Sequence, residues 1–221
     1  MARYKKGFEC EQARRQLVKA DKAFGPWIKR IGIIDYSPGW RRSFDVSDAL
    51  ARAILYQQLS GKAAATIVSR VEAAIGSAGI HHRALKTVGD EQLRACGVSG
   101  NKVLALRDLA RREAAGEIPL ARQLQYLSNE RIIEMLVPTR GIGRWTVEMM
   151  LMFRLGRPDV LPIDDLGIRK GAQLLDRLDA MPSPKELLER GRVWEPNQTM
   201  ASFYLWRIAD FSKENVKRSQ D

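Results

Sequence analysis

The chain has 221 residues, with 37 lysine and arginine against 26 aspartate and glutamate, so its formal net charge is +11 and its isoelectric point is near 9.9. No apolar run approaches the roughly 20 residues of a membrane-spanning helix. The two cysteines, Cys10 and Cys96, exclude a four-cysteine iron–sulfur cluster within the chain and form no metal-ligand motif. The basic residues are spread along the chain, which indicates a folded surface that meets a polyanion, with nucleic acid as the first candidate.

In chain order, nearly every segment shows the 3.6-residue period of an amphipathic helix. We therefore predict an all-α protein of about ten short helices. The expected helices cover residues 10–31, 45–59, 62–76, 89–97, 100–116, 128–137, 144–155, 164–175, 183–191 and 196–211. Asp45 or Ser47, Ser128 and Ser183 are placed to cap the starts of three of them, and Gly76 is placed to end another.

The stretch LVPTRGIGRWTVEMML, residues 136–151, has two glycines two positions apart directly before a helix. The first N–H groups of a helix have no partner within it, and glycines let an anion come close to the chain. Gly141 and Gly143 therefore form a candidate phosphate site, to which the flanking Arg140 and Arg144 can add charge. Taken alone, the pattern is more often a tight turn between two helices.

In its context, this stretch resembles the helix-hairpin-helix element of the DNA glycosylase superfamily, and GRPDVLPIDDLGIRKG resembles the loop that carries an essential aspartate there. The segments AILYQQLSGKAAATIVSRV, GVSGNKVLALRDLA and VWEPNQTMASFYLWR resemble three further parts of that fold. All five segments stand in the family's order, so the resemblance covers about 45–207. Within the superfamily, the chain most resembles the alkylated-base branch, DNA-3-methyladenine glycosylase II.

The resemblance implies an all-α, two-lobed helix-hairpin-helix glycosylase fold with a cleft between the lobes. The central helical lobe is expected at 45–160 and carries the helix-hairpin-helix at about 131–155. The second helical lobe is expected to consist of 1–44 plus 161–221. No cofactor and no metal ligand set is implied.

The same resemblance implies which aspartate is catalytic. The family's essential aspartate lies about twenty positions beyond the aromatic residue that opens the second hairpin helix, and from Trp145 this spacing leads to Asp165. A fixed carboxylate stabilises the positive charge that develops on the sugar and can orient the attacking water. One carboxylate is enough, because an alkylated purine is already cationic and leaves without a general acid. Asp164, beside the substrate, is then expected to cap the next helix, although the residues alone allow both aspartates to be caps.

Trp145 stands where strand-nicking members of the superfamily have a lysine nucleophile, so we expect a monofunctional enzyme. Its indole can stack on a flipped, electron-poor base, although the residue alone is also compatible with a place in the core. Met149 stands where some members have a tyrosine in the substrate pocket, and it makes that pocket less aromatic. Asn197 and Gln198 replace an aromatic residue or arginine that usually follows Trp-x-Pro, so base selectivity is left open.

A DNA-binding surface is also implied. Gln58 is expected to fill the gap that the flipped base leaves, with Leu59 as a second choice and Ser60 beside them. Carbonyl oxygens of Val137, Thr139 and Ile142 could hold a monovalent cation in the hairpin, as the family suggests. Phosphates would be held by Arg144 and by backbone N–H groups near Gly97, Gly100, Lys102, Thr139, Gly141 and Gly143.

We therefore interpret the chain as a monomeric, cytoplasmic, nucleoid-associated enzyme of base excision repair that has no membrane partner. It would flip 3-methyladenine, and also 7-methylguanine, out of double-stranded DNA and hydrolyse the N-glycosidic bond with the help of Asp165. Two alternatives stay open: a non-catalytic helix-hairpin-helix DNA-binding protein, and a glycosylase for another lesion such as hypoxanthine or uracil. A neutral leaving base needs more help than one carboxylate supplies, which disfavours the second.

Overall fold

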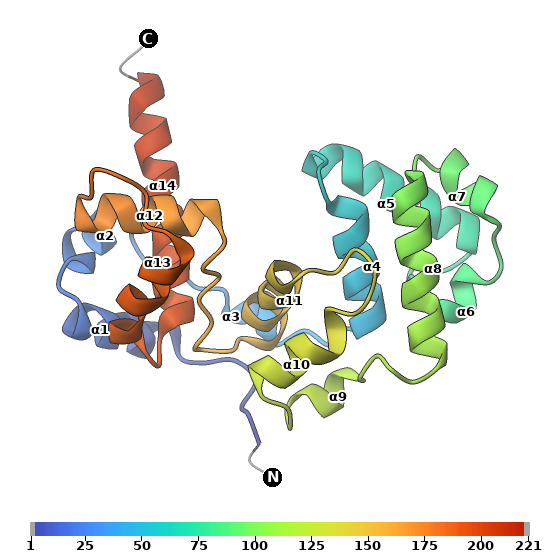
Figure 1. Ribbon diagram of the computed structural model, residues 1–221, viewed down its shortest axis with the longest axis horizontal. Coiled ribbons are helices and arrows are strands. Elements are labelled where there is room, and N and C mark those ends of the chain that lie inside the picture. The colour runs from blue at the N-terminus through green and yellow to red at the C-terminus, as the bar shows by residue number, and fades with distance from the viewer. Residues whose placement is uncertain (1–2, 219–221) are drawn as a thin grey trace. The chain divides into compact units, whose positions relative to one another are not determined.

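A computed structural model describes residues 3–218, with side chains through Phe211, and this part of the chain contains helices and no strand (Figure 1). The predicted all-α fold is confirmed. The helices outnumber the ten expected, for two reasons. The segment predicted as one helix at 10–31 is interrupted at Asp21, and three of the helices are single turns, too short to show a period.

The α-helices are α1 Cys10–Ala20, α2 Phe24–Ile31, α3 Ser37–Trp40, α4 Val46–Tyr56, α5 Gly61–Ile75, α6 His82–Leu85, α7 Asp90–Ala95, α8 Gly100–Ala114, α9 Ala121–Leu124, α10 Asn129–Leu136, α11 Arg144–Met150, α12 Leu166–Asp176, α13 Pro184–Gly191 and α14 Gln198–Arg218. A π-helical turn, η1 Leu151–Leu155, follows α11, and a 3-10 turn, η2 Arg192–Trp194, follows α13.

The predicted caps are largely confirmed. The side chains of Asp45, Ser128 and Ser183 each accept a hydrogen bond from the backbone N–H three residues further on. Gly76 ends α5 in the left-handed conformation. Ser47 does not cap α4, because it lies inside the helix and is buried.

The chain forms two compact units. The first unit contains 3–4 and 43–150, and the second unit contains 5–42 and 151–218. The boundary therefore lies at Met150 rather than near residue 160, where we had predicted it. The reason is that η1 packs against α3, where the indole Nε1 of Trp40 donates to the carbonyl of Met152 at 2.8 Å.

In the first unit, α4 packs against α5 and α8. The apolar side of α4 buries Leu50, Ile54 and Leu55, as its 3.6-residue period indicates. The helix ends at Tyr56, three residues earlier than predicted, and Leu59 is 40% exposed beyond its end. The segment after α4 therefore lies at the surface instead of continuing the core.

In the second unit, the main packing is between α12 and α14. A Cβ atom at Gly171 would lie 2.1 Å from the carbonyl oxygen of Leu205, so only glycine allows the two helices to approach this closely. Phe24 from α2 meets the rings of Trp194 and Tyr204 edge-on, and all three side chains are buried in the core of this unit.

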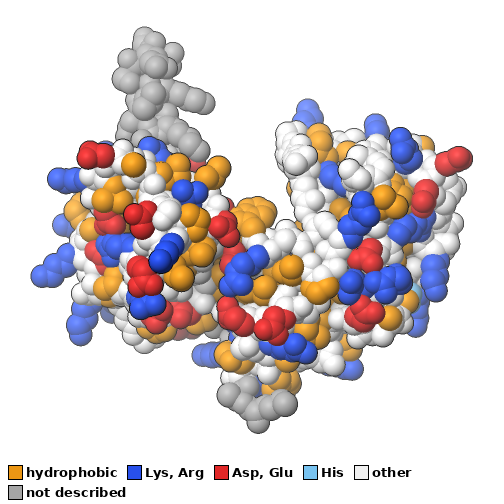
Figure 2. Space-filling model, in the orientation of Figure 1, with side chains coloured by type: hydrophobic (Ala, Val, Ile, Leu, Met, Phe, Trp, Pro, Cys, Tyr) orange, Lys and Arg blue, Asp and Glu red, His pale blue; other side chains and the backbone are white. Residues whose placement is uncertain are grey.

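The surface charge is mixed. On the face drawn in Figure 2, lysine and arginine side chains are dispersed over both units, and many lie near acidic side chains. Arg52, for example, pairs with both Asp48 and Glu72. Within residues 3–218, no helix has the length and apolarity that a bilayer crossing requires.

Candidate active site

The predicted helix-hairpin-helix is formed by α10, a short turn and α11. Two backbone hydrogen bonds shape the turn: Thr139 N–H donates to the Leu136 carbonyl and Ile142 N–H donates to the Thr139 carbonyl, each at 3.0 Å. Gly141 has a φ of +78°, and a Cβ atom there would lie 3.1 Å from the Cβ of Ala105 on α8. Both the left-handed backbone and the approach of α8 therefore require glycine at this position.

The backbone donors of this turn are partly occupied. The N–H of Arg140 donates to the Asp108 carboxylate on α8 at 2.9 Å. Contrary to our expectation, the Thr139 N–H is not available to a phosphate, because the turn itself uses it. Within residues 3–218, the N–H groups of Gly141 and Gly143 make no hydrogen bond, and both glycines are exposed. These two N–H groups are candidate anion donors at the start of α11.

Arg144 opens α11 and is half exposed, but its charge is already balanced. Its guanidinium contacts the carboxylate of Glu148 at 3.0 Å, one turn along the helix, and that of Glu130 at 3.2 Å. The Glu148 side chain is only 6% exposed. A phosphate at Arg144 would have to compete with these two carboxylates.

Trp145 is the second residue of α11 and is 47% exposed. An indole of this exposure is not a core residue, so that alternative for Trp145 is wrong. Met149 follows one helical turn later and is partly buried. The two side chains lie four positions apart, on one face of α11.

The segment between α4 and α5, which we call the 57–60 turn, contains the predicted wedge residues. Gln58 is exposed and has a φ of +56°, which is uncommon for a residue with a side chain. Leu59 is also exposed. The Ser60 hydroxyl accepts a hydrogen bond from the Ala63 N–H and so caps α5.

The N-terminus of α8 is the other predicted phosphate site. Gly97 has a φ of +97°, and its N–H donates to the Arg94 carbonyl, so this glycine shapes the turn and is not a free donor. Ser99 occupies the capping position without a side-chain hydrogen bond. Within the described chain, the N–H of Gly100 also makes no hydrogen bond. The Lys102 side chain points into the protein, where its Nζ donates to the carbonyls of α4's last turn.

In the second unit, the aspartate pair lies at the start of α12. Asp165 is the capping residue: its Oδ1 accepts a hydrogen bond from the Ile168 N–H at 2.9 Å. The prediction that Asp164 caps this helix is therefore wrong. Because α12 starts at Leu166, the capping position falls on Asp165, and Asp164 is exposed.

A residue that the sequence did not reveal holds the Asp165 carboxylate. Trp206, on α14, donates its indole N–H to Asp165 Oδ1 at 2.8 Å. Gly167 makes room for this contact, because a Cβ there would lie 2.9 Å from the Trp206 ring and 3.1 Å from the Asp165 carboxylate. The two partners are 41 positions apart, and no local pattern pairs them.

Aromatic side chains surround Trp206. The ring of Phe153 stacks on it, with 5.9 Å between centroids and 17° between planes, and Phe203 lies 6.3 Å away. Tyr36 meets Phe153 edge-on and is 39% exposed. The carboxylate of Asp165 thus lies at the edge of an aromatic cluster. A flat, electron-poor ring could stack on such a surface.

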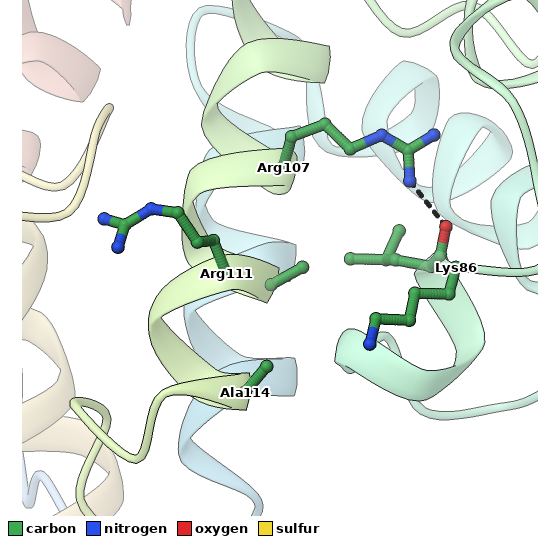
Figure 3. Close-up of a pocket in the computed structure, with 6 residues that line it drawn as sticks. Lys86, Arg107, Arg111 and Ala114 are labelled. Carbon is green, nitrogen blue, oxygen red and sulfur yellow. Dashed lines mark hydrogen bonds between the residues drawn. The ribbon is translucent and has the colours of Figure 1, made fainter.

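A pocket of about 360 Å³ lies elsewhere in the first unit, between α6 and α8 (Figure 3). Its lining consists of Leu85, Lys86, Arg107, Ala110, Arg111 and Ala114. Arg107 donates to the carbonyl of Leu85 at 2.5 Å and to that of Val88 at 2.7 Å. These hydrogen bonds hold the end of α6 and the residues after it against α8. None of the predicted site residues lines this pocket.

Known proteins of one superfamily are similar to this chain. Residues 51–196 match the model of the HhH-GPD superfamily, described as base excision DNA repair proteins. The chain is 39% identical, over 209 residues, to DNA-3-methyladenine glycosylase 1 of Schizosaccharomyces pombe, and the match covers 91% of this chain and 90% of that protein.

Two solved structures have the same fold. A DNA-3-methyladenine glycosidase from Bacillus halodurans is 33% identical and superposes with a TM-score of 0.81, covering 91% of each chain. The S. pombe 3-methyladenine DNA glycosylase, solved with abasic DNA, is 36% identical, with a TM-score of 0.75 over 89% of this chain and 95% of that chain.

Proposed function

The chain belongs to the HhH-GPD superfamily of base excision DNA repair proteins, as its motifs predicted, and we propose that it is a monofunctional DNA glycosylase for alkylated purines. It would release 3-methyladenine and 7-methylguanine from duplex DNA by hydrolysis, as a monomer and without a cofactor, on intracellular, nucleoid-associated DNA. The similar proteins named for 3-methyladenine support this substrate class.

The observation that carries the proposal is the way Asp165 is held. Hydrogen bonds from the Ile168 N–H and the Trp206 indole converge on one carboxylate oxygen, so the group is fixed before any substrate arrives. A fixed negative charge stabilises the oxocarbenium character of the sugar as the glycosidic bond breaks. The leaving base needs no general acid, because alkylation has already made it cationic.

Trp145 supports the monofunctional assignment. An indole has no amine that could attack the sugar and form a Schiff base, so the product would be an abasic site in an intact strand. Exposed at 47%, the ring is available to an extruded base. The aromatic cluster around Trp206 offers a second stacking surface.

Base flipping requires both phosphate anchors and a side chain that fills the gap in the duplex. The N–H groups of Gly141 and Gly143, and that of Gly100 at the start of α8, are proposed as anchors because they have no hydrogen bond within residues 3–218. Gln58, exposed on the 57–60 turn, is proposed as the residue that fills the gap, with Leu59 beside it.

The hairpin turn also fits a monovalent cation, with the carbonyl oxygens of Val137, Thr139 and Ile142 as its proposed ligands. The Thr139 hydroxyl is buried and makes no hydrogen bond within the described chain. A buried oxygen without a hydrogen bond calls for an explanation, and a bound ion in this turn would supply one. A cation there would attract a DNA phosphate.

The test is base release from methylated duplex DNA under single-turnover conditions. Wild type, Asp165→Asn and the matched control Asp164→Asn would be compared, with the released bases separated and strand nicking scored without alkali. We expect Asp165→Asn to lower the rate by about a hundred- to a thousandfold, as for loss of one preorganised electrostatic group. Asp164→Asn should lower the rate much less than Asp165→Asn, because Asp164 is exposed and does not cap α12.

The outcomes separate the alternatives. Release of methylated purines without nicking would support the proposal, and release of only hypoxanthine or uracil would replace its substrate. Tight DNA binding with no release by wild type would identify a non-catalytic helix-hairpin-helix protein. Nicking without alkali would contradict the monofunctional assignment.

A further inference from the structure

The end of α4 is held by a lysine from another helix. Lys102, near the start of α8, donates hydrogen bonds from Nζ to the carbonyls of Leu55 and Gln57, both at 2.8 Å. The last carbonyls of a helix have no partner within it, and a cation at this end also meets the negative pole of the helix dipole. Lys102 is partly buried, and this burial lowers the pKa of its ammonium group.

Directly after these carbonyls the backbone takes an unusual course. Gln57 is extended, with a φ of −53° and a ψ of 133°, and Gln58 is left-handed, with a φ of +56°. A residue with a side chain keeps the left-handed conformation only where its surroundings hold it there. Gln58 itself is exposed, so its neighbours hold the turn: the Leu59 N–H donates to the Tyr56 carbonyl at 3.3 Å, and Gln57 makes the contacts described here.

A second contact ties the same turn to the hairpin. The side chain Nε2 of Gln57 donates to the carbonyl of Gly141 at 2.7 Å. Gly141 in turn approaches Ala105 on α8 and Ile54 on α4, since a Cβ added to it would meet both side chains. The end of α4, the start of α8 and the hairpin turn thus meet at one place in the first unit.

We propose that Lys102 is a positioning residue that fixes the 57–60 turn through the end of α4, and that Gln57 links this turn to the hairpin. Gln58 would then reach the duplex in one conformation, in register with the phosphate anchors of the hairpin. This inference rests on the proposed function. It gives the Lys102 side chain a role within the protein rather than one at a DNA phosphate.

The test compares duplex and single-stranded DNA that carry the same alkylated base. A gap to be filled exists only in the duplex, so a defect in the 57–60 turn affects that substrate alone. Lys102→Met removes the donors and keeps an unbranched side chain, whereas Lys102→Arg can donate to the same carbonyls. Lys86→Met, at an exposed lysine directly after α6, is the control for loss of one positive charge.

We expect Lys102→Met to slow single-turnover release from the duplex about tenfold or more, since small misplacements are costly, and to leave release from the single strand within about twofold. Lys102→Arg should restore most of the duplex rate, and Lys86→Met should match wild type. Equal loss on both substrates, or no loss on either, would overturn the proposal.

Two further measurements test whether the Lys102 side chain binds a DNA phosphate and whether it acts independently of Gln58. Loss of a phosphate contact lowers, by about one, the slope of the logarithm of the DNA-binding constant against the logarithm of the salt concentration. Loss of a positioning residue leaves that slope unchanged. If Lys102 acts through Gln58, the double variant Lys102→Met with Gln58→Ala should be no slower than Gln58→Ala alone. A reduced slope, or additive effects, would contradict the inference.

Base flipping can be followed independently of hydrolysis. Fluorescence of 2-aminopurine placed next to the lesion rises when its stacking is lost. If wild type releases no base but raises this fluorescence, the proposed function fails. In that case Lys102→Met should still reduce the increase in fluorescence. If it does not, the positioning role of Lys102 is wrong as well.

Discussion

At the scale of single residues, the site depends on how a few polar groups are oriented. Asp165 caps α12 and accepts the Trp206 indole N–H with the same oxygen. A capping aspartate is usually a structural residue, but here the cap also fixes the direction of a charge. The helix start and the indole together leave the carboxylate little freedom to rotate, which is what electrostatic preorganisation requires.

Trp206→Phe should therefore lower catalysis more than DNA binding. It removes the N–H donor and keeps an aromatic ring in the cluster with Phe153. A hydrogen bond to a charged group contributes about 1.5–3 kcal/mol, so we expect the single-turnover rate to fall about tenfold or more. Trp27→Phe, in the same unit but away from Asp165, is the control and should match wild type. An unchanged rate in Trp206→Phe would show that the indole N–H does not orient the carboxylate.

At the scale of elements, the hairpin is built into the first unit by α8. Asp108 accepts the Arg140 N–H, and the Gly141 backbone lies against Ala105. The helix α8 therefore begins at one candidate phosphate site, at Gly100, and also supports the other, in the hairpin turn. Because α8 is a continuous helix, it keeps the two sets of N–H groups at a fixed separation.

The two hairpin glycines should respond differently to alanine. Gly141→Ala would hold a left-handed non-glycine residue and crowd Ala105, so we expect a loss of about 1–3 kcal/mol in the free energy of unfolding. Gly143→Ala meets no atom within 4 Å and should change that free energy by less than about 0.5 kcal/mol, while it weakens DNA binding by keeping a phosphate away. Urea unfolding and DNA titration measure the two effects, and equal stability losses would contradict this account of the turn.

The contact between α8 and the hairpin should be sensitive to acid. Burial raises the pKa of the Asp108 carboxyl, but hydrogen bonds from the Arg140 N–H and from Arg111 and Arg112 outweigh it, so the pKa lies below its ordinary value. The stabilisation is thus present above the unfolded-state pKa of about 3.9 and is lost as the pH falls through the lowered folded-state value. Asp108→Asn should be less stable than wild type at pH 6, and the difference should shrink toward pH 3. A difference that stays constant would rule out this ionisation as its cause.

At the scale of the whole molecule, the net charge of +11 is distributed over the surface and partly neutralised by ion pairs. Such a distribution favours DNA in general and carries no information about the lesion. Under the proposed function, recognition of the damaged base would therefore depend on side chains such as Trp145 and Trp206, and not on the overall charge.

Binding to undamaged duplex DNA should weaken steeply with salt. Each phosphate that the protein neutralises releases condensed counterions, so we expect the affinity to fall at least about tenfold between 50 and 200 mM salt. Fluorescence anisotropy with an unmodified duplex measures this, and Asp165→Asn should give the same slope because Asp165 touches no phosphate in the proposed mechanism. An affinity independent of salt would contradict the nucleic-acid interpretation of the charge.

The sequence by itself determined the features that depend on near neighbours in the chain. Helical periods and the caps at Asp45, Ser128 and Ser183 involve residues a few positions apart, so their spacing identifies them. The motifs from the 57–60 turn to the aspartate pair also identified the superfamily, which the comparisons confirmed.

Only the tertiary structure decided which distant groups meet. Trp206 reaches Asp165 across 41 positions, and Lys102 reaches the end of α4 across 45 to 47. It also assigned the cap of α12 to Asp165 instead of Asp164, because the position of the first helical residue is set by the packing of α12 on α14. Long-range contacts form when buried helix faces pack together, and a single sequence does not state which faces will meet.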